Sequence, residues 1–182
     1  MTRHYWNIFA GIVAVQLLLA WQVPITSDEA YFYTWAANLD VNYYDHPPLV
    51  GWLIYLFLAL GRHIFWFRLI AVGSGVIVAL GIKILAARLL NARDKARLLS
   101  LVYLAAPLHV LFIPISTDTP LFLFTFLCGA SFAWGVGRDR PLPVFVAGVF
   151  LGLAVLSKYF AVLLVPGLLA WLLCHRPRRF FS

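Results

Sequence analysis

The sequence predicts an all-α integral membrane protein with about six transmembrane helices. Of the 182 residues, 63% are hydrophobic and 12% are charged, whereas soluble domains carry roughly 45–50% and about 25%. A soluble domain of this length cannot bury so much apolar surface. The composition therefore excludes a soluble globular enzyme, a disordered chain and a disulfide scaffold. The apolar residues also fall into long runs separated by short basic segments, which is typical of membrane spans.

The first predicted helix is the apolar run 6–25. At 1.5 Å per residue it spans about 30 Å, which is the thickness of the hydrocarbon layer. Trp6 and Trp21 bracket the run as interfacial aromatic residues do. A signal peptide would also place an apolar run here, but no small-x-small cleavage site follows it. We expect a retained helix with a cytoplasmic N-terminus, because Arg3 precedes the run.

Five later apolar runs complete the predicted set of spans. They are residues 64–90, 98–115, 120–136, 144–156 and 159–174. The run 49–60 reaches only about 18 Å as a helix, which is too short to cross the hydrocarbon layer. We expect it to lie in the interface or to re-enter, within a first outer loop from about residue 26 to 67. That loop is predicted to hold one or two helices lying along the membrane.

The distribution of charge supports this topology. If 49–60 crossed the membrane, basic residues would face outward in successive loops, against the positive-inside rule. If it does not cross, Arg3 and the basic segments 88–97, 138–140 and 176–179 all face the cytoplasm. The acidic residues then separate as follows: Asp28, Glu29, Asp40, Asp45 and Asp118 outside, Asp94 and Asp139 inside. The formal net charge of +7 thus indicates membrane topology and not nucleic-acid binding.

Two adjacent carboxylates, Asp28 and Glu29, open the first outer loop. Carboxylates here suit a general base or a metal site, and burial beside a like charge would raise one pKa. The same residues also suit a helix start. Thr26 and Glu29 fit a capping box, and acids in a first helical turn favour the helix dipole. The two interpretations are compatible.

A second polar cluster contains Tyr44, Asp45 and His46, followed by two prolines. The tyrosine offers a stacking face for a sugar. Asp45 and His46 suit a ligand site, or a divalent metal site shared with Asp28. The alternative is a helix-entry turn with interfacial tyrosines, because proline restricts the residue before it to extended conformations.

Three charged residues complete the candidates. Asp118 either caps the next helix, with Pro120 in its first turn, or faces the same outer cavity as Asp28. Lys158 interrupts an apolar run at the predicted outer end of the fifth span. It is either a functional residue, suited to an anionic ligand such as a lipid phosphate, or a lysine that snorkels to the headgroups. Arg62 and Arg68 are similar candidates.

Four motifs in this order resemble a known family. They are Asp-Glu-Ala-Tyr at 28–31, Tyr-Asp-His-Pro-Pro-Leu at 44–49, Thr-Asp-Thr-Pro-Leu at 117–121 and Gly-Leu-Ala-Val-Leu-Ser-Lys-Tyr at 152–159. The pattern resembles the N-terminal part of the family 39 glycosyltransferases of the GT-C fold. These include protein O-mannosyltransferases and bacterial aminoarabinose-to-lipid A transferases. Such proteins are generally longer, so we expect residues 1–182 to form a single domain that is the N-terminal portion of a complete enzyme.

The resemblance implies transfer of a sugar from a polyprenyl-phosphate donor to a lipid, glycan or protein acceptor. The expected location is the outer (periplasmic) face of a bacterial inner membrane. It implies Asp28 as the base with Glu29 in support, and Asp118 as a second acid. Lys158 and Arg62 would bind the donor phosphate, and Tyr44, Asp45 and His46 the substrate. A divalent metal ion is a candidate cofactor, with Asp28, Asp45 and His46 as candidate ligands.

A non-catalytic membrane protein, such as a lipid-carrier flippase or a small transporter, is the alternative function. In that case Lys158 and Asp118 would line a transport path.

Overall fold

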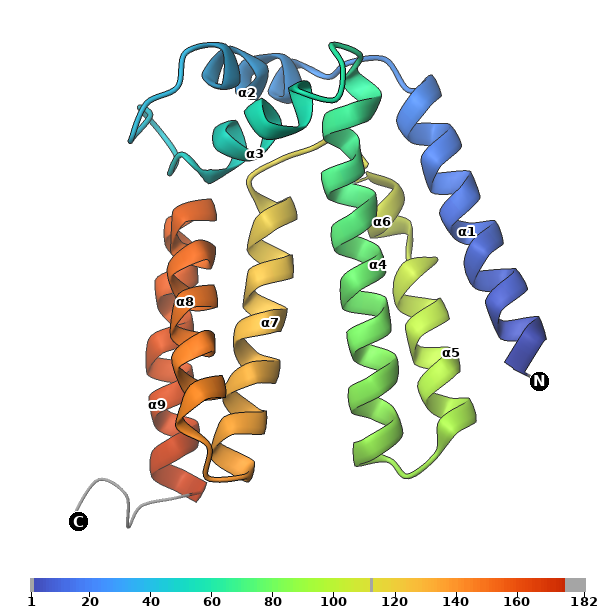
Figure 1. Ribbon diagram of the computed structural model, residues 1–182, viewed down its shortest axis with the longest axis vertical. Helices are drawn as coiled ribbons and strands as arrows, with labels where there is room; N and C mark the ends of the chain where they lie inside the picture. The colour runs from blue at the N-terminus through green and yellow to red at the C-terminus, as the bar shows by residue number, and fades with distance from the viewer. Residues whose placement is uncertain (1, 112, 176–182) are drawn as a thin grey trace.

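The computed structural model describes residues 2–111 and 113–175, and the regular secondary structure in these ranges is helical (Figure 1). The elements are α1 (Thr2–Gln22), α2 (Ser27–Ala37), α3 (Leu49–Leu58), α4 (Ile64–Leu89), α5 (Arg93–Leu104), α6 (Pro107–Leu111), α7 (Asp118–Gly137), α8 (Pro141–Ser157), the 3-10 helix η1 (Tyr159–Leu163) and α9 (Leu164–His175). No strand occurs within the described ranges. The prediction of an all-α protein is confirmed.

Three helices are long and apolar enough to cross a membrane. They are residues 3–22 of α1, α4 and α7. Three shorter apolar helices lie at Leu49–Leu58, Pro141–Ser157 and Tyr159–Cys174. These helices make the chain an integral membrane protein. Of the six predicted spans, the first, second and fourth thus have the full length of a membrane span, and the fifth and sixth are shorter helices.

The predicted span 98–115 is interrupted. Helix α5 ends at Leu104 and α6 begins at Pro107. Proline has no amide hydrogen, so it cannot continue the helical hydrogen-bond ladder. The carbonyl of Leu104 instead accepts a hydrogen bond of 2.9 Å from the side-chain amide of Gln16 on α1. A buried polar side chain therefore satisfies the backbone where the helix breaks.

The long helices stand side by side, and α2 and α3 lie across one end of them (Figure 1). Helices α1, α4 and α5 form one side of the bundle, and α7, α8 and α9 form the other. Helix α3 corresponds to the run that was too short to span, and it does not run through the bundle. The expected helical first loop is thus observed as a platform, which consists of α2, α3 and their connection.

The charges separate between the two ends of the bundle as predicted. We call the end that carries α2 and α3 the acidic end. Its acids are Asp28, Glu29, Asp40, Asp45 and Asp118. At the opposite, basic end lie Arg88, Arg93, Lys95, Arg97, Arg138 and Arg140, together with Asp94 and Asp139. The predicted basic segment 176–179 lies outside the described residues.

A cluster of buried aromatic and branched side chains fixes the platform to α4. It contains Phe32, Trp35, Val50, Ile54, Phe67 and Ile115. The ring of Tyr43 stacks on Trp35 with centroids 4.2 Å apart and planes within 2°. Gly51 lets α3 approach α2 closely, because an added Cβ would lie 3.0 Å from the Cβ of Trp35. This packing sets where the polar residues of the platform lie.

Lys83 is a cation within the predicted second span that the sequence analysis did not single out. Its ammonium lies 4.2 Å from the ring centroid of Trp6 and 5.0 Å from that of Tyr5. Cation–π contacts of this kind stabilise a partly desolvated charge. Because Lys83 lies near the basic end of α4, it is remote from the acidic residues of the platform.

Candidate active site at the acidic end

Glu29 and Arg68 form an ion pair in which neither side chain is exposed. Arg68 donates from Nε to Oε1 of Glu29 at 2.7 Å and from Nη2 to Oε2 at 2.6 Å. It also donates to three carbonyls at the end of α1, those of Ala20, Val23 and Pro24. The amide of Ile115 donates to Oε1 of Glu29 at 3.1 Å. The pair therefore ties α1, α2, α4 and the segment before α7 together.

Glu29 also completes the capping box expected at the start of α2. Its amide donates to Oγ1 of Thr26 at 3.3 Å, and its Oε2 accepts from the amide of Thr26 at 3.0 Å. From the sequence, Arg68 was a candidate for an anionic ligand and not the expected partner of Glu29. This pairing had a signal in the sequence. A buried carboxylate needs a nearby cation, and few basic residues lie at this end of the bundle.

Asp28 has different surroundings from its neighbour. Successive residues of an α-helix point about 100° apart, so Asp28 faces outward where Glu29 faces the core. Asp28 is exposed, and it makes no hydrogen bond or ion pair with any other residue that the structure describes. It lies in the first turn of α2, where the helix dipole favours a negative charge. Its carboxylate is therefore available to a ligand.

Tyr31 connects the exposed face of α2 to the α2–α3 connection. It follows Asp28 by three residues and so lies on the same face of the helix. Its hydroxyl donates to Oδ1 of Asp45 at 3.2 Å. The ring of Tyr44 is fully exposed, and His46 is partly buried before the buried Pro47. Tyr44 thus offers a stacking face, and Asp45 is held toward α2.

Lys158 and Asp118 are in direct contact. Nζ of Lys158 lies 2.8 Å from Oδ1 and 3.0 Å from Oδ2 of Asp118. About a quarter of each side chain is exposed, 24% for the lysine and 27% for the aspartate. Thr117, and not Asp118, is the N-cap of α7, so of the two alternatives for Asp118 the capping role is wrong. Asp118 instead lies in the first turn and binds the cation at the end of α8.

Tyr159 links this ion pair to the platform. Its hydroxyl donates to Oδ1 of Asn42 at 3.2 Å, across 117 positions of sequence. Asn42 lies three residues before Asp45 in the α2–α3 connection. A chain of contacts therefore runs from α2 through this connection to the end of α8. Sequence reasoning missed Asn42 and Tyr159, although both lie beside or within the motifs that it singled out.

The remaining predicted residues are not assembled into a site. Arg62 is exposed between α3 and α4 and makes no hydrogen bond or ion pair with another described residue. Within residues 2–111 and 113–175, no three or more His, Cys, Asp or Glu side chains are grouped so that they could hold a metal ion. Asp28, Asp45 and His46 therefore do not form a metal centre in this structure, and Asp45 is engaged by Tyr31.

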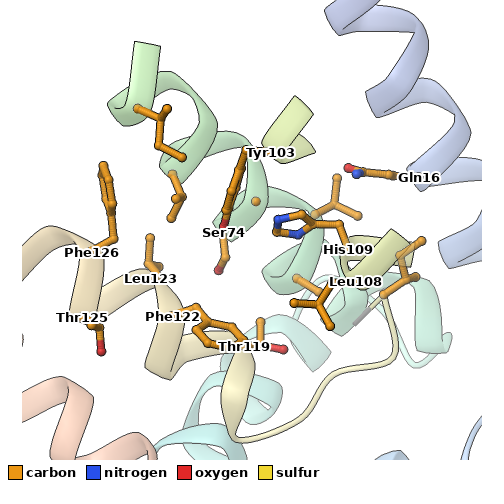
Figure 2. A pocket seen from close by; sticks show the side chains of 16 residues that line it. Gln16, Ser74, Tyr103, Leu108, His109, Thr119, Phe122, Leu123, Thr125 and Phe126 are labelled. Carbon is orange, nitrogen blue, oxygen red and sulfur yellow. The ribbon is translucent and has the colours of Figure 1, made fainter. Parts of the chain in front are cut away.

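A cavity of about 360 Å³ lies inside the bundle, below the acidic end. Helices α4, α5, α6 and α7 contribute most of its lining, and Gln16 reaches it from α1 (Figure 2). His109 and Tyr103 lie together on one wall, with ring centroids 4.3 Å apart. The opposite wall includes Phe122 and Phe126 of α7. We call this space the bundle cavity.

Comparison with known proteins agrees with the resemblance drawn from the four motifs. Residues 45–182 match the family described as dolichyl-phosphate-mannose-protein mannosyltransferase. The chain is 28% identical over 170 residues to the lipid A galacturonosyltransferase RgtD of Rhizobium johnstonii, an alignment that covers 87% of this chain and 36% of that protein. The chain thus spans about a third of the length of this curated relative. No solved structure matches. The chain belongs to the dolichyl-phosphate-mannose-protein mannosyltransferase family of GT-C glycosyltransferases.

Proposed function

We propose that the chain acts in sugar transfer from a polyprenyl-phosphate donor to a lipid, glycan or protein acceptor. The observation that carries this proposal is the meeting of Lys158 and Asp118 at the end of the bundle that also presents Asp28. A cation for a phosphate and a free carboxylate for a hydroxyl proton are the two groups that this reaction needs.

In the proposed reaction, the acceptor hydroxyl attacks the anomeric carbon of the sugar. The bond from that carbon to the phosphate oxygen breaks, and polyprenyl phosphate leaves with the bonding electrons. Asp28 takes the hydroxyl proton, which an exposed carboxylate with no partner among the described residues is able to do. A single displacement of this kind inverts the configuration of the anomeric carbon.

Glu29 supports Asp28 by position. Because Glu29 and Arg68 are buried together and bind the end of α1, they fix where α2 begins. Asp28, which directly precedes Glu29, is then held in a fixed position on the platform. Glu29 is thus a positioning residue, and Asp28 is the candidate catalytic residue.

Lys158 is proposed to bind the donor phosphate. A lysine ammonium has three donors, and its two short distances here go to a single carboxylate group. The side chain is partly exposed, so a phosphate oxygen can reach it. A fixed positive charge beside the leaving phosphate stabilises the transition state. Asp118 holds the lysine in place, and Arg62 is a second candidate cation at this end.

Tyr44, Asp45 and His46 are proposed to contact the sugar or the acceptor. The exposed ring of Tyr44 suits stacking on a sugar face, and Asp45 and His46 supply hydrogen-bonding groups nearby. The named relative acts on lipid A, which makes a lipid the first acceptor to test.

The acidic end is proposed to face outward from a bacterial inner membrane. Six arginine and lysine residues gather at the opposite end among the described helices and their connections, and clusters of this kind remain in the cytoplasm. The reaction would then take place at the periplasmic surface as part of cell-envelope glycosylation.

The donor is tested in membranes that contain the full chain. Radiolabelled sugar is supplied either on polyprenyl phosphate or on a nucleotide, with synthesis of the lipid-linked sugar blocked. We expect label in the acceptor fraction from the lipid-linked donor alone. Transfer from the nucleotide donor, or from neither donor, would contradict the proposal. Movement of the lipid-linked sugar between leaflets without transfer would favour a flippase.

A further inference from the structure

Lys83 is a cation within a membrane-spanning helix, and it makes no hydrogen bond or ion pair with any other described residue. It lies six residues before the end of α4, which is about 9 Å along the helix axis. Asp94, an acid at the same end of the bundle, is paired with Arg97 at 2.8 Å. A charge at this depth is costly unless other groups compensate it. The proposed sugar transfer does not use Lys83, because the transfer site lies at the acidic end.

Two aromatic rings of α1 compensate part of this charge. The ammonium of Lys83 lies 4.2 Å from the ring centroid of Trp6 and 5.0 Å from that of Tyr5. The two rings meet edge to face, with centroids 4.9 Å apart and planes inclined by 68°. They therefore form a corner in which the ammonium is attracted to both rings. We call Lys83, Tyr5 and Trp6 the aromatic corner.

Tyr5 fixes the aromatic corner to three helices. Its ring is buried, and its hydroxyl lies 3.0 Å from Oγ of Ser100 on α5. Ser100 donates its own hydroxyl to the carbonyl of Arg97 at 2.8 Å, so the tyrosine is the donor in the first contact. The ring packs in a buried cluster with Phe9, Ala79 and Leu104. The corner is thus held by the packing of α1, α4 and α5.

The aromatic corner stays open to a ligand. Lys83 is half-buried, and 44% of Trp6 is exposed. The N–H groups of the ammonium that point away from the rings are free to donate to an anion. Arg3 is exposed and lies three residues before Trp6, on the same face of α1. A second positive charge therefore stands one helical turn closer to the membrane surface.

We infer that the aromatic corner and Arg3 bind the phosphate of an anionic phospholipid in the leaflet at the basic end. Basic sites between membrane helices bind anionic headgroups in this way. Ile84 follows Lys83, and Ile77 lies two turns deeper on the same face of α4. About half of each isoleucine is exposed, so both offer an apolar surface to the acyl chains of that lipid. This site takes no part in sugar transfer and does not depend on the proposed function.

Two lysines at the basic end give a matched pair of variants. Lys83→Gln and Lys95→Gln remove the same charge from the same end of the bundle. Lys95 is exposed on α5, and no ring lies over it among the described residues. A lysine that merely snorkels to the headgroups has no built site, so loss of either lysine would then have the same effect. Lys83→Arg is the conservative variant, because arginine keeps both the charge and the cation–π contact.

The test measures lipid binding to the full chain in detergent by native mass spectrometry. The probes are phosphatidylglycerol, which is anionic, and phosphatidylcholine, which is zwitterionic. The wild-type chain should prefer phosphatidylglycerol. Lys83→Gln should raise the dissociation constant for phosphatidylglycerol about tenfold, equivalent to about 1.4 kcal/mol. Lys95→Gln should raise it by less than about twofold, as an exposed charge does, and Lys83→Arg should bind much like the wild type.

Three results would overturn the inference. They are equal affinity of the wild-type chain for the two lipids, equal weakening by the two glutamine variants, and displacement of phosphatidylglycerol by an equal concentration of glycerol phosphate. The last result would make the ligand a soluble phosphate instead of a lipid. The wild-type comparison and Lys83→Arg decide the point even if Lys83→Gln fails to fold.

Discussion

Glu29 and Arg68 show how much can depend on one buried ion pair. Both side chains are fully buried, and the arginine donates to the carboxylate and to three backbone carbonyls. Taking two charges out of water is costly, and only close pairing offsets that cost. Loss of one partner leaves the other charge buried and uncompensated, which is far worse than loss of both.

Arg68→Met is therefore expected to lower the free energy of unfolding by about 3–5 kcal/mol. The double variant Glu29→Gln with Arg68→Met should recover part of the loss, because no buried charge remains. Arg62→Met is the matched control, since Arg62 is exposed and without a partner among the described residues. Unfolding in detergent measures all three. Equal effects of Arg62→Met and Arg68→Met would contradict the assigned role.

Lys158 is proposed to act in sugar transfer and not mainly in the stability of the chain. We expect Lys158→Gln to lower kcat by about 100-fold, the usual effect of removing one stabilising donor. Lys158→Arg should retain part of the activity. Lys95→Gln, at the basic end, is the control and should leave transfer unchanged. If Lys158→Gln transfers sugar at the wild-type rate, Lys158 does not bind the donor phosphate.

The sequence singled out most residues of the candidate site, but it did not show which of them are buried and which are exposed. Asp28 and Glu29 are adjacent, and each had a plausible catalytic and a plausible structural role. Only the rotation of α2 against α4 decides which one is buried. The contact between Tyr159 and Asn42 joins segments 117 positions apart, and no local pattern encodes it.

At the scale of elements, the interruption between α5 and α6 is the main departure from prediction. The sequence contained its cause, because Pro107 lies inside the run that was taken as one span. The compensating group was not predictable, since Gln16 comes from another helix 88 positions away. The sequence thus predicted where apolar segments begin and end better than it predicted whether each segment forms one unbroken helix.

Gln16→Leu is expected to destabilise the chain by about 1–3 kcal/mol, because the carbonyl of Leu104 loses its buried donor. Gln22→Leu makes the same change at an exposed position at the end of α1, and it should have little effect. Thermal unfolding of the two variants in the same detergent gives the comparison. A larger loss for Gln22→Leu would argue against a role for the Gln16 hydrogen bond.

At the scale of the whole molecule, charge and apolar length predicted the architecture well. Most of the acids and most of the basic residues of the described ranges do lie at opposite ends, and the short run 49–60 does lie across the bundle. Both results follow from the cost of placing charge or unpaired backbone in hydrocarbon. The bundle cavity was not predictable, because it depends on contacts such as Phe126 against Gly81.

The proposed sidedness predicts how single cysteines react. In a chain with Cys128 and Cys174 replaced by alanine, Val41→Cys lies in the exposed α2–α3 connection. It should react with a membrane-impermeant thiol reagent added to intact cells. Asp94→Cys, at the basic end, should react only after the membrane is permeabilised. The opposite pattern would place the acidic end in the cytoplasm.

The most direct measurement compares sugar transfer by two carboxylate variants at the same end of the bundle. Asp28→Asn should lower kcat by about 10²–10⁴-fold, the usual contribution of a general base, with little change in the KM for the lipid-linked donor. Asp40→Asn removes another exposed carboxylate of the platform, and it should transfer sugar at the wild-type rate. Undiminished transfer by Asp28→Asn would contradict the proposed mechanism at its centre.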